Sequence, residues 1–292
     1  MLKESWYPAL VAIAASFVAF FPAPASAQPA PDANSVLVLS SVDGGGAYSA
    51  AAAAAGFTVV AATDAQWTAR STADFATFRA LIIGDPTCGD VPPAAAEGNA
   101  ATWSAAVNGP KLIIGSDEHF HFGSGGSTLI NSGIGYVTSG GPTQTGAYIS
   151  LSCYYDSAAP SSVPLLAGFG SFTASGTGGG CFDDSHLVAS HPALAGSTDA
   201  TLSNWSCSVH EIFRAFPSGF IPLAIARGIT GPGSMTFADG SFGVPYILAS
   251  GGGIVPIGTV DTAVPTLSEW GLIVMAALLA ISAIVLLRRR SH

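Results

Sequence analysis

Four short apolar runs in the first half of the chain constrain its fold most strongly. None of them alternates apolar with polar residues, and they cover residues 36–41, 57–61, 80–84 and 111–115. The intervening segments have helical character: an alanine-rich stretch at 48–55, a capping-box pattern at 71–74 and a proline-led stretch at 92–107. Apolar strands separated by helices are typical of a parallel sheet covered on both faces. The sequence therefore predicts an α/β fold with a mostly parallel, Rossmann-like sheet, in which ligands bind beyond the carboxyl ends of the strands.

The second half of this domain is less regular. After residue 115 the sequence becomes rich in Gly, Ser and Thr, and we expect further strands at 147–152, 171–174, 221–226 and 246–250. The rest of this Gly-, Ser- and Thr-rich middle is expected to be loop, and a more regular pattern returns at 191–196 and 209–216. The predicted exported domain extends over residues 35–258 with no internal repeat.

The amino terminus has the pattern of a secretory signal peptide. Residues 1–27 combine a weakly positive start at Lys3, an apolar stretch at 9–21 and a small-residue cleavage site at 25–27. An uncleaved amino-terminal anchor is the alternative, although the apolar run is short for a membrane span. Residues 28–34 then form a Pro- and Ala-rich leader.

The carboxyl terminus has the pattern of a membrane anchor. Residues 271–287 carry no charge and one hydroxyl, and as a helix they would be roughly 25 Å long. Trp270 precedes the run, and arginines at 288–290 follow it and would remain in the cytoplasm. A buried core helix is the alternative, but the run lacks a polar face. We therefore predict inner-membrane anchoring with the domain outside the cytoplasm.

The residues just before this run form a recognisable motif. It consists of Val264, Pro265, Thr266, Leu267, Ser268, Glu269, Trp270 and Gly271. This motif resembles the IPTL-type sorting signal, a relative of the PEP-type signals that exosortase-like proteases recognise in Gram-negative bacteria. The resemblance covers 264–292, after a linker at 259–263, with Val264 in place of the usual isoleucine. It implies export by the Sec machinery, transient anchoring through 271–287, cleavage by an exosortase-like protease, and transfer to the cell surface or beyond it.

Charge and cysteine content limit the partners and the compartment. Residues 28–265 carry sixteen of the acidic residues and five of the basic ones, a net charge of −11 without a basic stripe, so nucleic acid is a poor partner. Four cysteines in an exported chain favour two disulfides, with three connectivities open: Cys88, Cys153, Cys181 and Cys207. We favour the pairs Cys153–Cys181 and Cys88–Cys207.

A second, patchier resemblance covers residues 35–253. The runs at 80–84 and 111–117, the box at 191–196 and the stretch at 209–213 resemble class I glutamine-amidotransferase-like domains of the trehalose-utilisation type. The resemblance implies a flavodoxin-like three-layer sandwich. Asp117 stands where the family has its nucleophilic cysteine, so glutamine hydrolysis is not carried over.

The densest group of chemically active side chains follows the 111–115 strand. Asp117, Glu118, His119 and His121 lie within five residues, and Asp117, His119 and His121 are candidate metal ligands. Candidate catalytic residues are Asp117, His119, His210 and Glu211. Further carboxylates and imidazoles lie far along the chain, at Asp183, Asp184, His186 and His191. Because no second ligand pair has a recognised metal spacing, the alternative is that these histidines only hydrogen-bond loop backbone, and no cofactor is predicted.

These observations leave three functions for the domain. The leading one is a non-catalytic ligand-binding or envelope module, because the family nucleophile is absent. The second is an exported hydrolase, assisted by a divalent metal and using Asp117, His119 and His121. The third is a glycan-binding module, which requires Tyr154, Tyr155 or Trp205 to be exposed in a groove.

Overall fold

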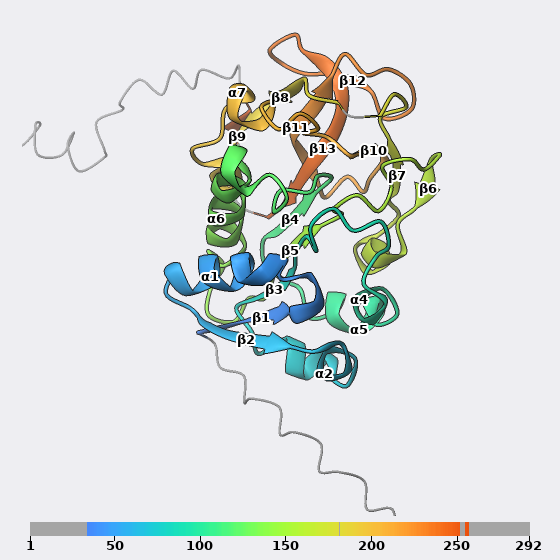
Figure 1. Ribbon diagram of the computed structural model, residues 1–292. Coiled ribbons are helices and arrows are strands. Elements are labelled where there is room, and N and C mark those ends of the chain that lie inside the picture. Colours follow the sequence, from blue (N-terminus) through green and yellow to red (C-terminus); the bar gives the residue numbers. More distant parts are fainter. Residues whose placement is uncertain (1–33, 181, 252–254, 257–292) are drawn as a thin grey trace, which may run out of the picture. The chain divides into compact units, whose positions relative to one another are not determined.

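A nine-stranded mixed sheet forms the centre of the computed structural model, which describes residues 34–180, 182–251 and 255–256 (Figure 1). Five neighbouring strands run parallel, in the order β2 (Thr58–Ala62), β1 (Ser35–Leu39), β3 (Ala80–Ile83), β5 (Gly146–Ser150) and β4 (Lys111–Ile114). Beyond β4 the sheet continues with antiparallel pairs, through β13 (Phe242–Ser250), β11 (Ile221–Arg227) and β8 (Ser185–Leu187), with β12 (Met235–Thr236) pairing β13. The expected α/β class with a mostly parallel sheet is confirmed.

Helices cover the parallel part of the sheet on both faces (Figure 1). On one face, α1 (Ala47–Ala54) and α6 (Gly126–Val137) pack with the side chains of alternate strand residues into one apolar core. The opposite face carries a second core built with four short helices: α2 (Asp64–Thr68), α3 (Thr72–Phe75), α4 (Ala94–Glu97) and α5 (Ala100–Ser104). Because both faces are buried, the strands need no polar alternation.

Smaller elements lie beside the main sheet. A three-stranded sheet contains β10 (Glu211–Ala215), β7 (Thr173–Gly176) and β6 (Ser161–Ser162), and β9 (Ala189–Ser190) pairs with β14 (Val255–Pro256). The remaining helix α7 (Asp199–Leu202) and the 3₁₀ helices η1 to η5 are short: Ser40–Val42, Gly44–Gly46, Phe122–Ser124, Pro164–Phe169 and Pro192–Leu194. The amino end of β10 is the part of these elements that reaches the functional site.

Helix α6 is the main element that the sequence did not predict. Its residues include several poor helix formers, and the sequence pattern indicated loop there. Packing compensates for this low propensity: Leu129, Ile130 and Ile134 are buried, and a Cβ on Gly133 would collide with Tyr148. Tertiary contact therefore outweighs local preference along α6.

Two other expectations need correction. The single helix expected at 92–107 is split into α4 and α5, with Gly98 and Asn99 between them. The strand order 2-1-3-5-4 also differs from the flavodoxin order 2-1-3-4-5, because β5 lies between β3 and β4. The capping box at Ser71 is present and opens α3.

The predicted signal peptide, the linker, the sorting motif and the carboxyl-terminal span lie outside the described residues. Within the ranges that are described, no helix has both the length and the apolar character needed to cross a bilayer.

Candidate functional site

The loops after β3, β4 and β5 meet at the carboxyl edge of the parallel sheet. Each loop has a polar side chain within three residues of the end of its buried strand, and these loops carry Asp85 with Cys88, Asp117 with His121, and Ser152 with Cys153. Parallel strands bring such loops together because all their carboxyl ends lie at the same edge. The site therefore lies where the sheet topology predicts it.

Asp117, His121 and His210 converge at this edge. Asp117 Oδ1 lies 3.4 Å from His121 Nε2 and 3.0 Å from His210 Nε2, and one ligand atom from each residue lies within 4.8 Å of the other two. The exposed fractions of these side chains are 1%, 12% and 8%, so the group is largely removed from solvent.

Local backbone structure places these three residues. The His121 amide donates to the Asp117 carbonyl at 3.4 Å, and this turn folds His121 back toward Asp117. His210 arrives from another part of the chain, because its amide donates to the Gly115 carbonyl at 3.2 Å. A Cβ on Gly115 would overlap the Glu211 carbonyl oxygen, so glycine is required for β10 to approach the end of β4. The ring of His121 stacks on Trp205, with centroids 5.3 Å apart, and this contact orients the imidazole.

The contact between Asp117 and His210 is close but lacks hydrogen-bond geometry. Asp117 Oδ1 and His210 Nε2 are buried, and neither has a hydrogen-bond partner within the described part of the chain. Burial lowers the pKa of His210, but the carboxylates of Asp117 and Asp156 outweigh this effect and raise the pKa above its ordinary value. The two atoms thus face each other at ion-pair distance without a hydrogen bond of good geometry.

Asp85 binds the three loops together. Its carboxylate is fully buried and accepts five hydrogen bonds of 2.6–3.2 Å, from the amides of Thr87, Cys88, His119 and Phe120 and from the Ser152 hydroxyl. Each of the three loops supplies at least one of these donors. The carboxylate therefore ties the turn that follows Asp117 to the loops after β3 and β5.

A second buried carboxyl, that of Glu118, belongs to the same turn and anchors it to the residues beneath through hydrogen bonds. Glu118 Oε1 accepts hydrogen bonds from the hydroxyls of Tyr48 and Tyr148, and Oε2 lies 2.9 Å from the Ser150 hydroxyl. Burial raises the pKa of Glu118 to about 8, and the nearby Asp85 adds to the shift. A neutral Glu118 satisfies this network, because its proton can be donated to Ser150 Oγ while the Ser150 hydroxyl donates to the Ser116 carbonyl.

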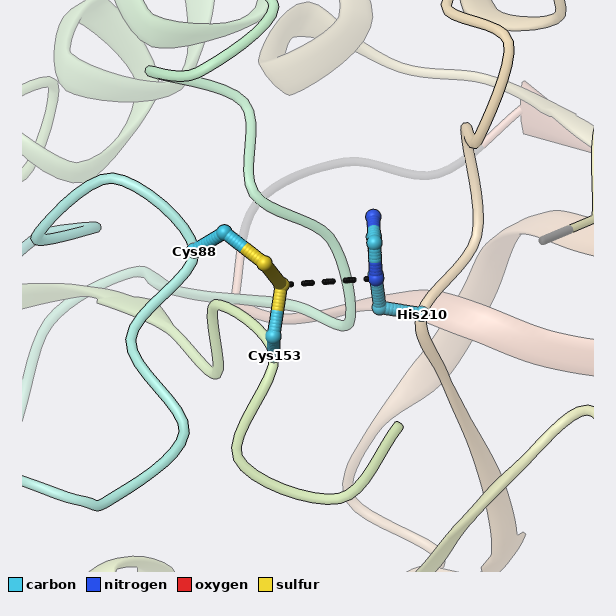
Figure 2. A group of neighbouring side chains, drawn as sticks. All are labelled: Cys88, Cys153 and His210. Atoms are coloured by element: carbon cyan, nitrogen blue, oxygen red, sulfur yellow. Dashed lines mark hydrogen bonds between the residues drawn. A yellow bond between two sulfur atoms is a disulfide. The ribbon is translucent and has the colours of Figure 1, made fainter. Parts of the chain in front are cut away.

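The described disulfide differs from both predicted pairs. Cys88 is bonded to Cys153, so the predictions Cys153–Cys181 and Cys88–Cys207 are wrong. The reason is topological, since Cys88 follows β3 and Cys153 follows β5, which are neighbours in the sheet. Figure 2 shows that His210 faces this bond, with Nδ1 3.4 Å from Cys153 Sγ. Cys207 is also disulfide-bonded, and no described cysteine is free.

Two candidate catalytic residues do not join the cluster. The ring of His119 points toward Gly44 and lies 3.1 Å from Thr87 Oγ1. Glu211 is buried beside His210, but its Oε1 accepts from the Tyr155 amide at 2.8 Å. Burial holds the pKa of Glu211 well above its usual range, although the Tyr155 hydrogen bond acts in the opposite direction.

The more distant candidate ligands have partners of their own. Asp183 accepts from the Ser208 amide, Asp184 pairs with Arg227, His186 lies between two carboxylates and His191 accepts from the Ala193 amide. The exposure that the glycan-binding hypothesis requires is not found, because Tyr154, Tyr155 and Trp205 are all buried.

Sequence reasoning missed Asp85 and Asp156. Asp85 has the same position relative to β3 that Asp117 has relative to β4, namely the first acidic residue beyond the strand, and this signal could have identified it. Asp156 lies 3.5 Å from His210 Nδ1 on the side away from Asp117. No sequence spacing connects Asp156 with His210.

No curated protein and no solved structure is detectably similar to the chain. The resemblance to amidotransferase-like domains is accordingly not confirmed. Residues 262–290 match the family model described as the IPTL-CTERM motif, and the chain therefore carries the carboxyl-terminal sorting signal of an exported, cell-surface protein.

Proposed function

We propose that this protein is sorted to the cell surface and that its α/β domain binds a divalent transition-metal ion through Asp117, His121 and His210. One observation carries the proposal: Asp117 Oδ1 and His210 Nε2 are buried and 3.0 Å apart, yet neither makes a hydrogen bond within the described residues. Buried polar atoms normally have partners, and a cation between these atoms would satisfy both.

The spacing of the donor atoms supports this proposal. Two ligand atoms at metal–ligand distances of about 2.0–2.2 Å in tetrahedral geometry are about 3.3–3.6 Å apart. The distances from Asp117 Oδ1, 3.0 Å to His210 and 3.4 Å to His121, lie close to this range. The site therefore needs little rearrangement to bind an ion.

The surroundings of the ligands also suit a metal site. His210 directs its other ring nitrogen toward Asp156 Oδ1 at 3.5 Å, an arrangement that orients a metal-binding imidazole when the proton of Nδ1 points at the carboxylate. Trp205 and Asp85 hold His121 and the Asp117 turn. Such supporting contacts typically change metal affinity 10–100-fold when removed.

Two imidazoles and one carboxylate are the ligand set of catalytic zinc sites and of non-haem iron(II) sites. We therefore expect the purified protein to retain close to one equivalent of zinc or iron, measured by elemental analysis, and to unfold at a higher temperature with the added ion. Asp117→Ala and His121→Ala are expected to abolish retention. His119→Ala is the matched control, because its imidazole lies in the same loop and points elsewhere.

The outcome that would contradict the proposal is equally specific. If the wild-type protein retained no metal and its melting temperature did not respond to zinc, iron(II) or manganese, the cluster would be a closed network of buried polar groups. Equal retention by the wild type and Asp117→Ala would place any bound ion elsewhere.

Metal-assisted hydrolysis is a second candidate. Three protein ligands leave room for a metal-bound water, the usual composition of catalytic sites. Phe120 and Phe122, in the His121 loop, are 60% and 45% exposed and offer an apolar surface beside the site. Turnover on an ester, amide or glycan panel that is lost in Asp117→Ala but kept in His119→Ala would support this function, and its absence would favour a binding module.

The second part of the proposal concerns the export and sorting of the protein. The motif at 262–290 supports processing by a sorting enzyme of the exosortase type. We propose export by the Sec machinery, transient inner-membrane anchoring through residues 271–287, and release of the domain to the cell surface or beyond it after cleavage near the motif.

A further inference from the structure

The two ring nitrogens of His210 face two different groups of side chains. Nε2 lies 3.0 Å from Asp117 Oδ1, whereas Nδ1 lies 3.4 Å from Cys153 Sγ (Figure 2). The two sulfur atoms of the Cys88–Cys153 bond and one ring nitrogen of His210 all lie within 4.8 Å of one another. If the disulfide were reduced, two thiols and one imidazole would therefore already be close enough to bind a metal ion.

The two cysteines differ in their accessibility. Cys88 is exposed, while Cys153 is buried beside His210. We therefore expect a reductant to attack the disulfide from the Cys88 side, which releases the sulfur of Cys153 beside His210.

The backbone around both cysteines adopts a conformation that is uncommon outside glycine. Thr87, Cys88 and Ser152 have φ angles of 81°, 53° and 53°. Three of the four non-glycine residues with positive φ in the described ranges thus adjoin this disulfide or belong to it. Such residues cluster at functional sites, because the surrounding structure must hold them there.

We propose that the Cys88–Cys153 disulfide is a redox control on the metal site, and that its reduction transfers a thiophilic ion such as Zn²⁺ to Cys88, Cys153 and Nδ1 of His210. This rests on the proposed metal site, because both ligand sets share His210. In the reaction a dithiol reductant gives up two electrons and two protons and becomes a disulfide, while the sulfur–sulfur bond breaks to give two thiols. The ion then displaces both thiol protons and is held by two thiolates.

One imidazole supplies one metal-binding nitrogen while the other nitrogen keeps its proton. The oxidised protein therefore uses Nε2 with Asp117 and His121, and the reduced protein uses Nδ1 with the thiolates. Thiolates bind zinc-like ions more strongly than a carboxylate does, so we expect reduction to tighten binding by at least about ten-fold.

Cobalt(II) is a direct probe of this change, because thiolate ligation produces an intense near-ultraviolet charge-transfer band. The full-length protein is compared in its oxidised form and after reduction with a phosphine that is removed before cobalt is added. We expect the band only after reduction, together with the tighter binding. Cys88→Ser/Cys153→Ser is the matched control, since it retains the Cys207 disulfide, and it should show no band under identical treatment.

Protection from alkylation tests the same proposal, and its main measurement uses the wild-type chain, so it does not depend on the folding of a variant. Zinc should shield Cys88 and Cys153 of the reduced protein from iodoacetamide, as located by peptide mass spectrometry, and His210→Ala should weaken this shielding.

The outcomes separate this inference from the proposed function. Cobalt binding by the oxidised protein without a charge-transfer band after reduction would overturn the redox control and leave the Asp117 site intact. A band that persisted in the double cysteine variant would assign it to Cys207 and its partner, and would also overturn the inference. Absence of cobalt from both forms would overturn both proposals.

Discussion

At the scale of single residues, His186 forms an ion-pair bridge between two carboxylates outside the functional site. Its ring nitrogens lie 2.6 Å from Asp199 Oδ2 and 2.8 Å from Asp239 Oδ2. Burial lowers the pKa of His186, but the two carboxylates outweigh this effect and raise the pKa above 6.5. Hydrogen bonding by Ser241 and the contact with His186 together lower the pKa of Asp239 to about 2, although burial opposes them. The His186–Asp239 pair is therefore charged from well above pH 2 up to about pH 6.5, the ordinary pKa of histidine, and its contribution is lost as the pH rises through the raised value.

This bridge predicts a pH-dependent contribution to stability. Because the folded-state pKa of His186 is raised, its contribution is complete below about pH 6.5 and is lost as the pH rises through the folded value. His186→Gln should lower the free energy of unfolding by about 0.5–1 kcal/mol at about pH 5.5 and have little effect at about pH 9. Urea unfolding of both proteins at the two pH values measures the difference, and a deficit that was equal at both would contradict the bridge.

Glu118 allows a second prediction at this scale. Its carboxyl accepts from two buried tyrosine hydroxyls, so Glu118→Ala should cost about 2–5 kcal/mol by leaving both without an acceptor. Glu118→Gln retains the carbonyl oxygen and a donor toward Ser150, and should cost about 1 kcal/mol or less at neutral pH. Chemical denaturation would distinguish the two, and similar losses in both variants would show that the carboxyl is required in its charged form.

At the scale of elements, Asp85 positions the turn after β4 through hydrogen bonds to His119 and Phe120. Asp85→Asn replaces an acceptor oxygen with a donor amide, so it should lower the free energy of unfolding by about 2–4 kcal/mol. It should also weaken metal binding about ten-fold, because the Asp117 turn loses its support. Asp90→Asn, an exposed change in the same loop, is the control and should alter neither quantity.

Some elements could be predicted from the sequence because the local pattern determines them, whereas others could not because tertiary contacts determine them. The runs at 36–41 and 80–84 are continuous apolar segments, and both are strands within a residue or two of the expected bounds. Helix α6 was not predicted because its stability comes from tertiary packing: Gly133 lies against Tyr148 of β5 and Leu112 of β4. Likewise, the pairing of Cys88 with Cys153 follows from β3 and β5 being neighbours, which no local pattern encodes.

At the scale of the whole molecule, the candidate site depends on contacts between distant segments. Asp117 and His121 could be proposed from one short stretch, but His210 joins them only because the chain returns to Gly115, where the Ser116 hydroxyl donates to the Ser208 carbonyl at 2.7 Å. His119 looked equivalent to His121 in sequence and is directed elsewhere by Thr87. The sorting motif, by contrast, is a continuous segment and could be read without the fold.

This continuity makes the sorting signal separable from the domain, which gives the last prediction. Replacing Pro265 and Glu269 with alanine should block cleavage but not export, because the signal peptide and the apolar run at 271–287 are unchanged. The variant should remain at full length in the membrane fraction, while the wild type loses its carboxyl terminus, as measured by intact mass and fractionation. Asp261→Asn, just before the motif, is the control and should be processed normally. An intact carboxyl terminus on the mature wild-type protein would refute processing, and the motif would then mark a permanent anchor.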